Sequence, residues 1–293
     1  MRTFAVVAVL AALCAPAAAG LIAYEGVNHD PGVLRGNVPD LNLNAWSDQG
    51  NDGYQVTSPG LTYGSLQVSG NKAIGGGAWT SAGLTIQMPA TWEPDNEWVP
   101  YRKLGPGDVR FRAGKEGTTL WASFLVEDWV ADDGNRVRFA NSHVGWNPGS
   151  NGVGVKVDGG NWKLEDVASG AVTDTGVART INETYLMVLK FEFMIGGDGE
   201  TATWEEGCDR VTMFVNPTPG AAAPDVAGTV MSTTTDLALL NVHFYPGSGS
   251  SEGAIDEIRL GETYADVTPV PEPATLALVA LGGLMPLLRR RRR

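Results

Sequence analysis

The chain has 293 residues, with 33 acidic side chains, 21 Lys and Arg, and two cysteines. Six of the basic residues but only one acidic residue lie in residues 1–20 and 269–293. Residues 21–268 therefore hold 15 basic and 32 acidic residues, a net charge of −17. Such a surface repels nucleic acid and anionic lipid, which excludes a nucleic-acid partner. It suits an exported protein, or one that binds cations or neutral glycans. Solubility alone also explains this charge and is the interpretation that we favour.

Residues 1–20 have the organisation of a secretory signal peptide. Arg2 gives a positive start, Phe4 to Leu13 form an apolar core, and Ala17 to Ala19 are the small residues that signal peptidase requires. We expect cleavage on one side or the other of Gly20, so that the signal is absent from the folded protein.

The two cysteines support neither a lipid anchor nor an internal disulfide. Cys14 lacks the large aliphatic residue three positions before it and the small residue directly before it that a lipoprotein signal needs. Once the signal peptide is removed, Cys208 is the only cysteine, although an exported compartment would permit a disulfide. The stability of the domain must then come from its core.

Residues 21–268 are predicted to form one all-β domain. Apolar residues alternate with polar ones, most clearly in 185–195, where the odd-numbered residues are apolar and Lys190 and Glu192 lie on the other face. Turn sequences such as Asp133-Gly134 separate the runs. The predicted strands are 21–25, 61–69, 82–88, 120–130, 136–141, 152–157, 161–167, 185–195, 210–215, 237–245 and 253–260.

Many short antiparallel strands joined by tight turns favour an antiparallel two-sheet jelly-roll sandwich. Two stretches rich in turn-forming residues, 89–108 and 217–236, are predicted to be long loops between strands. No 20–50-residue repeat indicates a propeller or a solenoid.

The last 25 residues, 269–293, have three distinct parts. The tetrapeptide Val270, Pro271, Glu272 and Pro273 comes first, followed by an uncharged apolar run, Leu276 to Leu288. The chain then ends in five basic residues: Arg289, Arg290, Arg291, Arg292 and Arg293. An apolar run before a cationic cluster predicts a transmembrane segment with a cytoplasmic stop. Its 13 residues are fewer than the roughly 20 of a full span, but snorkelling arginines extend its reach.

This tripartite tail resembles the PEP-CTERM sorting signal of Gram-negative bacteria. The resemblance implies processing near the Pro-Glu-Pro by an exosortase, a membrane enzyme similar to a transpeptidase. The chain would be exported and held in the inner membrane by its C-terminal segment, and after processing it would reach the cell surface or the extracellular space. An ordinary short C-terminal anchor is the alternative.

The middle of the chain resembles the concanavalin-like, laminin-G-like jelly roll that exported proteins with such tails often carry. The resemblance rests on Leu21 to Gly26, Leu61 to Leu66, Val211 to Gly220 and Ile255 to Gly261. These motifs are structural, so the resemblance implies the fold and a surface role and no catalytic activity.

We predict that the domain is not an enzyme. Glycosidases of this fold place two carboxylates on one strand in a Glu-x-Asp-x-x-Glu arrangement, which this sequence lacks. Glu252, Asp256 and Glu257 come nearest, but Asp256 and Glu257 are adjacent, and neighbours on a regular strand point to opposite faces. The alternatives to a non-catalytic, carbohydrate-binding domain are a divergent carbohydrate-active hydrolase and a purely structural surface protein without a ligand.

Tryptophans supply the candidate glycan contacts, because sugar rings stack on exposed aromatic faces. Trp92, Trp98 and Trp146 lie in turn-rich segments and are the predicted contacts. Trp121 and Trp129 share strand parity, and we assign them to the core or to the surface of a sheet.

Acidic loops supply the candidate calcium ligands. Asp128, Asp132 and Asp133, with Asn135, form one such loop, and Asp198 with Glu200 forms another. The resemblance to concanavalin-like domains also implies one structural calcium. The alternative is that these acids only shape Asp-Gly turns.

Overall fold

The computed structural model describes residues 20–271 with several gaps. The gaps are 35, 38–39, 42, 44–45, 49–53, 76–81, 86–100, 104–110, 115–116, 130–132, 141–151, 195–208, 235–236, 238, 240 and 245–252. Residues 1–19 of the predicted signal peptide lie outside the described residues, as do residues 272–293 of the tail. No helix of the described part is both long enough and apolar enough to cross a membrane.

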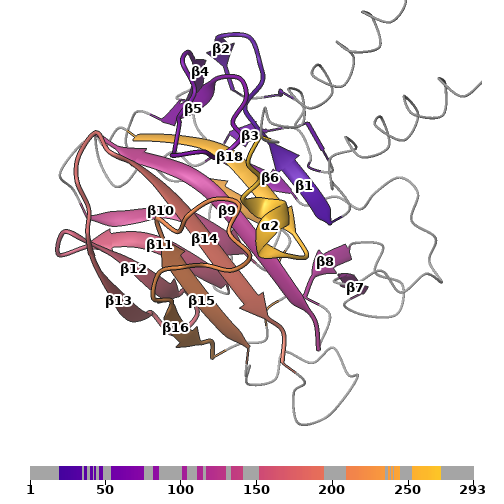
Figure 1. Ribbon diagram of the computed structural model, residues 1–293, viewed down its shortest axis with the longest axis vertical. Helices are drawn as coiled ribbons and strands as arrows, with labels where there is room; N and C mark the ends of the chain where they lie inside the picture. The colour runs from indigo at the N-terminus through magenta and orange to yellow at the C-terminus, as the bar shows by residue number, and fades with distance from the viewer. Residues whose placement is uncertain are drawn as a thin grey trace, which may run out of the picture.

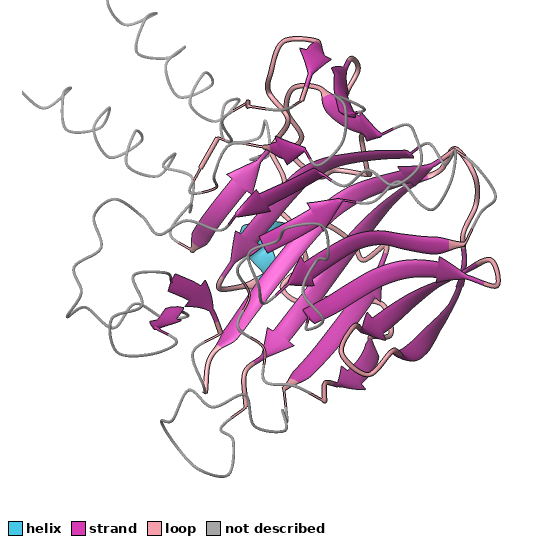
Figure 2. Ribbon diagram, turned by 180° about the vertical axis from the view of Figure 1, so that it is seen from behind, coloured by secondary structure: helices cyan, strands magenta, loops and turns pink. Residues whose placement is uncertain are grey.

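Two antiparallel sheets face each other, which confirms the predicted all-β jelly-roll sandwich (Figures 1 and 2). Among the described residues the larger sheet has nine strands. Its order is β16 (Thr229–Ser232), β15 (Arg210–Val215), β14 (Thr184–Glu192), β9 (Thr119–Asp128), β18 (Gly253–Gly261), β5 (Lys72–Gly75), β4 (Tyr54–Thr57) and β2 (Gly32–Val33). The ninth strand, β1 (Leu21–Glu25), also pairs with β18.

The second sheet has seven strands in the described part of the chain. Its order is β13 (Ala171–Ala178), β12 (Asn161–Asp166), β11 (Gly152–Asp158), β10 (Gly134–Ala140), β17 (Asn241–Phe244), β6 (Ala82–Thr85) and β3 (Ser47–Asp48). A separate ribbon pairs β7 (Tyr101–Lys103) with β8 (Phe111–Ala113). A single-turn helix, α2 (Tyr264–Val267), follows β18 and begins at a capping box formed by Thr263 and Asp266.

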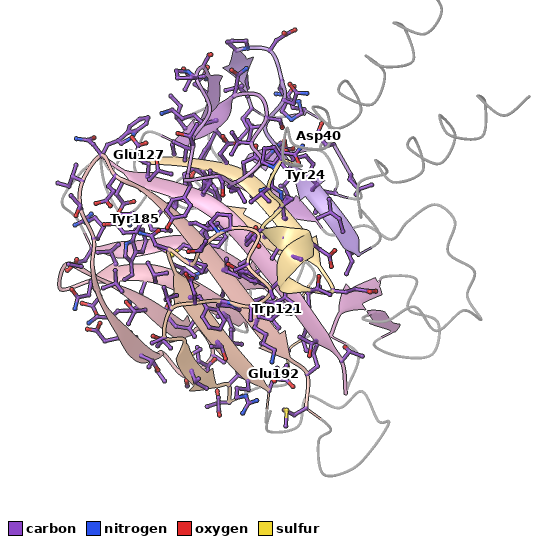
Figure 3. The ribbon with its side chains drawn as sticks, viewed as in Figure 1. Tyr24, Asp40, Trp121, Glu127, Tyr185 and Glu192 are labelled. Carbon is purple, nitrogen blue, oxygen red and sulfur yellow. The ribbon has the colours of Figure 1, made fainter. Side chains whose placement is uncertain are left out.

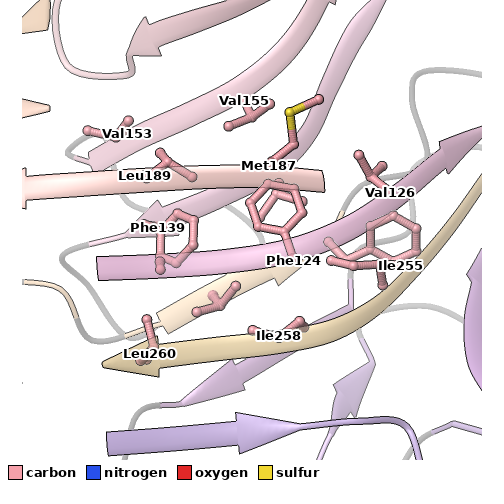
Figure 4. Packing of buried hydrophobic residues seen from close by; sticks show 14 of the residues in the cluster. Phe124, Val126, Phe139, Val153, Val155, Met187, Leu189, Ile255, Ile258 and Leu260 are labelled. Carbon is pink, nitrogen blue, oxygen red and sulfur yellow. The ribbon is translucent and has the colours of Figure 1, made fainter. Parts of the chain in front are cut away.

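The main core fills the space between the two sheets (Figure 4). Tyr185, Met187, Leu189, Phe191 and Phe193 all belong to it, as the period-two pattern predicts. From the opposite sheet come Phe139 and the valines of β11. The Phe139 ring lies edge-on to Phe191, with centroids 5.3 Å apart, a geometry that aromatic pairs prefer.

The outer face of the nine-stranded sheet is also buried at its centre. Leu125, Leu186, Val188 and Ala254 point away from the main core and form a second apolar cluster. Two elements cover it, the segment 58–71 and helix α2, which contribute Leu61, Leu66, Tyr264 and Val267. This covering explains why β14 is buried on both faces at Leu186 and Val188, while Lys190 and Glu192 beyond the cover stay partly exposed.

The predicted strand 61–69 is wrong, because this stretch is a loop. Its apolar residues pack downward onto the sheet on both sides of a turn, in which the Leu66 N–H donates to the Tyr63 carbonyl at 2.9 Å. Eight of the described strands were not predicted: β2, β3, β4, β5, β7, β8, β13 and β16. Of these, β13 and β16 are edge strands with mostly exposed residues, so they lack the apolar alternation that marks a strand. Strand β16 lies inside the predicted loop 217–236, and β7 inside the predicted loop 89–108.

The core makes a direct prediction for stability. Phe139→Ala removes a fully buried ring that contacts rings from the other sheet, so unfolding should become easier by about 3–5 kcal/mol. Val230→Ala, on an edge strand and 52% exposed, is the control and should stay within about 0.5 kcal/mol of wild type. Chemical denaturation measures both, and equal losses would contradict the assignment of this core.

Candidate functional site

Over β10, β11, β12 and β17 the outer face of the seven-stranded sheet is polar, in contrast to the covered face of the nine-stranded sheet. Core residues alternate with polar ones along its strands, so Arg138, Lys156, Lys163, Glu165 and His243 point away from the main core. A continuous polar row on a sheet face is the usual arrangement for contact with water or with a polar ligand.

Three charged side chains meet at the centre of this face. The Glu165 carboxylate lies 3.8 Å from an Arg138 guanidinium nitrogen and 3.4 Å from the Lys156 ammonium nitrogen. Gly154 stands between Arg138 and Glu165 in the strand register. Because Gly154 has no side chain, the two charged groups can meet across its strand. The group is recessed, with Arg138 and Lys156 each 19% exposed and Glu165 12% exposed.

The row continues on β17, where His243 lies directly opposite Arg138 in the register. His243 is 7% exposed and its neighbour Asn241 is 3% exposed. We use the name polar row for Arg138, Lys156, Glu165, Asn241 and His243. These five side chains offer guanidinium, ammonium, imidazole and amide donors together with carboxylate and amide acceptors, which is the chemistry that recognises hydroxyl groups.

The polar row does not contain the pair of carboxylates that glycosidases use. Glu165 is its one carboxylate among the described residues. On the neighbouring row Asp158 and Asp174 are paired with Lys163, at 3.4 and 3.7 Å from its ammonium nitrogen.

On the other sheet, a β-bulge in β18 places two acids side by side. The register shifts between Asp256 and Arg259, and Glu257 adopts a left-handed backbone with φ of 55°. Ile255 and Ile258 both face the main core, so Asp256 and Glu257 both point outward. The expectation that these two acids point to opposite faces is therefore wrong. The three-residue spacing between the two isoleucines was the sequence signal for the bulge.

Both acids hold the covering segment 58–71 through its backbone. Asp256 Oδ2 accepts from the Leu61 N–H at 2.8 Å, and Glu257 accepts a short hydrogen bond from the Ser69 N–H. Glu257 also accepts from the Tyr24 hydroxyl at 3.0 Å and is paired with Arg259. Tyr24 lies at this edge of the fold close to Asp40 (Figure 3).

Burial, together with the neighbouring charge of Glu257, raises the pKa of Asp256 to about 9. Burial also raises the pKa of Glu257, against the opposing effect of Arg259. Both side chains are fully buried, so near neutral pH a proton on Asp256 avoids two adjacent buried negative charges.

The predicted glycan contacts Trp92, Trp98 and Trp146 lie outside the described residues, so they stay predictions. Trp121 and Trp129 are on the outer face of the nine-stranded sheet, where they pack against the second apolar cluster. Trp121 stacks on Phe214 with centroids 6.1 Å apart, and Lys190 lies 5.9 Å from its ring. Their assignment to the surface of a sheet is confirmed.

The structure gives Asp128 a different role from that of a calcium ligand. It is buried, with one carboxylate oxygen 2.7 Å from Arg136 Nε and the other 3.0 Å from an Arg179 nitrogen. Arg136 is also buried, so this cluster ties β9 to β10 and to the connection before β14. Asp128 therefore gives the calcium prediction no support.

Asp133 shapes a turn, as the alternative interpretation of the acidic loop predicts. Its carboxylate accepts from the N–H groups of Gly159 and Gly160 at 3.0 and 3.5 Å. The bond from Gly159 lowers the pKa of Asp133. Asp132, Asp198 and Glu200 lie outside the described residues, as does the side chain of Asn135. The described part of the chain contains no group of three His, Cys, Asp or Glu side chains arranged to hold a metal.

The first half of the tail tetrapeptide lies on the domain. Val270 is partly buried and Pro271 is exposed, whereas Glu272, Pro273 and the five terminal arginines lie outside the described residues. Residues 269–293 match the family model of the PEP-CTERM protein-sorting motif. The chain therefore carries this sorting motif at its C-terminal end, as the tripartite pattern predicts.

A comparison with curated proteins finds no match. Solved structures with a similar arrangement include an HCR/D mutant (TM-score 0.44, 9% identity, 86% of this chain and 50% of that one). A second is a Trypanosoma rangeli sialidase with DANA (TM-score 0.42, 12% identity, 85% of this chain and 32% of that one). A third is domain 4 of AbnA, an arabinanase from Geobacillus stearothermophilus, with arabinotriose (TM-score 0.41, 12% identity, 85% of this chain and 98% of that one). The chain spans half or less of the first two. The jelly-roll assignment rests on the strands of this chain and on the way they pair.

The raised pKa of Asp256 predicts how stability depends on pH. The unfolded chain releases this proton above about pH 4 whereas the folded protein keeps it up to about pH 9, so the free energy of unfolding should fall as pH rises between these values. For this one group the slope is at most about 1.4 kcal/mol per pH unit. Asp256→Asn cannot ionise and should flatten the profile, which denaturant titrations at several pH values measure. An unchanged slope in the variant would show that Asp256 is not the group responsible.

Proposed function

We propose that this chain is an exported, exosortase-sorted cell-surface or extracellular-matrix protein whose jelly roll binds neutral polysaccharide without catalysis. The observation that carries the proposal is the sorting motif at residues 269–293, behind an all-β domain with a net charge of −17. Before processing, the C-terminal segment would hold the chain in the inner membrane, and the processing enzyme would be its first partner.

The polar row supports a polysaccharide as the ligand. Guanidinium, ammonium and carboxylate groups can each bond to hydroxyls, and Arg138, Lys156 and Glu165 lie partly exposed on one sheet face beside the buried Asn241 and His243. The net charge of the domain opposes a polyanion at long range, which favours a neutral polymer. The predicted tryptophan contacts would add stacking to these hydrogen bonds.

Binding without catalysis is favoured because the described part of the polar row holds a single carboxylate, which is already 3.4 Å from Lys156. A divergent carbohydrate-active hydrolase would need a second acid at the correct separation from Glu165. Release of reducing sugar from a polysaccharide would identify that alternative. Absence of both release and binding would leave a structural surface protein without a ligand.

Arg138→Ala tests the polar row directly. The variant should be retained on insoluble neutral polysaccharide about tenfold less than wild type, because a charge-assisted hydrogen bond contributes about 1.5–3 kcal/mol. A pull-down of the exported chain on a panel of insoluble and native extracellular polysaccharides, with and without chelator, measures retention.

Arg210→Ala is the matched control. Arg210 forms a similar pair with Glu192, at 2.8 Å, but on the other sheet, so its removal should leave retention unchanged. Equal retention of wild type and both variants would contradict the assignment of the polar row. A loss caused by chelator alone would point to a cation in the ligand contact.

A further inference from the structure

The sorting motif begins inside the folded domain, without a linker before it. After α2 the chain runs between the covering segment 58–71 and residues 217–221. The Gly220 N–H donates to the Thr268 carbonyl at 2.9 Å, and the Gln67 N–H donates to the Pro269 carbonyl at 2.8 Å. The two carbonyls that precede Val270 are therefore bonded to the domain.

Val270 itself packs against Gly220. A Cβ atom on Gly220 would lie 2.7 Å from Val270 Cγ1 and 3.3 Å from Val270 Cβ, so only glycine fits against the docked valine. The backbone of Gly220 also has a φ of +73°, a conformation that by itself favours glycine. We call Thr268, Pro269 and Val270 the docked segment.

Little chain separates the docked segment from the membrane. Residues 272–275 lie between Pro271 and the apolar run that begins at Leu276, and four extended residues span at most about 14 Å. The two stretches that hold the docked segment, 58–71 and 217–221, contain no charged residue, but Asp225 lies beside them, where its carboxylate accepts from the Thr218 N–H at 2.8 Å.

We propose that the docked segment limits processing, so that the folded domain restrains cleavage of its own sorting motif. A processing enzyme must hold an extended stretch of substrate on both sides of the cut, and proteolysis of folded proteins requires local release of such a stretch. Here the backbone carbonyls of Thr268 and Pro269 accept hydrogen bonds from the domain. The four residues 272–275 are too few to extend the motif away from the domain. The docked segment must detach before the motif can enter an active site. This inference rests on the proposed processing.

Gly220→Ala loosens the docked segment and is the first test. Its new Cβ displaces Val270, so tail removal should be at least about threefold faster than in wild type, in proportion to the population of the released state. Gly170→Ala is the matched control. Gly170 has φ of +71°, so the backbone strain is the same, but nothing lies within 4 Å of the added Cβ. Pulse–chase of the full chain in a host with the processing enzyme measures the rate.

A disulfide gives the opposite test and does not depend on loosening the fold. The 3.3 Å between the positions of the two Cβ atoms is close to the roughly 3.5–4.5 Å that a disulfide spans. Gly220→Cys with Val270→Cys should therefore lock the docked segment in an oxidising compartment. Processing should stop and resume when reductant is added, whereas Gly220→Cys alone, which has no cysteine at position 270 to pair with, should be processed with or without reductant.

Two results would overturn the proposal: a Gly220→Ala rate equal to that of Gly170→Ala, or full processing of the oxidised double-cysteine variant. Failure of the proposed function is distinct from both. In that case the wild-type chain would never lose its tail and would behave like a Glu272→Ala variant.

Discussion

Two adjacent buried carboxylates, Asp256 and Glu257, determine how the outer face of the nine-stranded sheet is covered. A bulge in β18 turns both of them to that face, where they accept from the backbone N–H groups of Leu61 and Ser69. An ionised acid in this position is unfavourable unless it is paired and hydrogen-bonded. The segment 58–71 supplies those hydrogen bonds, and Arg259 supplies the charge partner of Glu257.

The position of the tail follows from this contact. With the segment 58–71 fixed on the sheet, Leu61 and Leu66 cover the second apolar cluster, and the Gln67 N–H is placed to bind Pro269. The same segment thus completes a core and holds the start of the sorting motif. This sheet therefore carries the contact with the sorting motif, whereas the proposed ligand contact lies on the opposite sheet.

The sequence predicted the sandwich because several of its longer strands carry apolar residues at period two. Strand β14 places every odd residue from Tyr185 to Phe193 in the main core, as expected. The errors have physical causes. The apolar residues of 61–69 lie in a loop that covers a sheet. Strands β13 and β16 are exposed edge strands, so they lack the apolar face by which a strand is predicted.

The candidate sites were harder to predict, because they depend on register and on tertiary partners. Periodicity alone does not reveal that Gly154 lets Arg138 meet Glu165, or that Asp128 is neutralised by Arg136 and Arg179. The bulge was visible in principle, since the core residues Ile255 and Ile258 are three apart. The sorting motif was predictable in full because its parts are contiguous in the chain.

The central claim is that the buried acids of β18 hold the covering segment and, through it, the start of the tail. Amide hydrogen exchange on the exported full chain, comparing wild type with Glu257→Gln, tests it most directly. We predict faster exchange at Ser69 and Gln67 in the variant, with unchanged protection in β9 and β14. Unchanged exchange at Ser69 and Gln67 would contradict the account, because the segment would then be held without the acid.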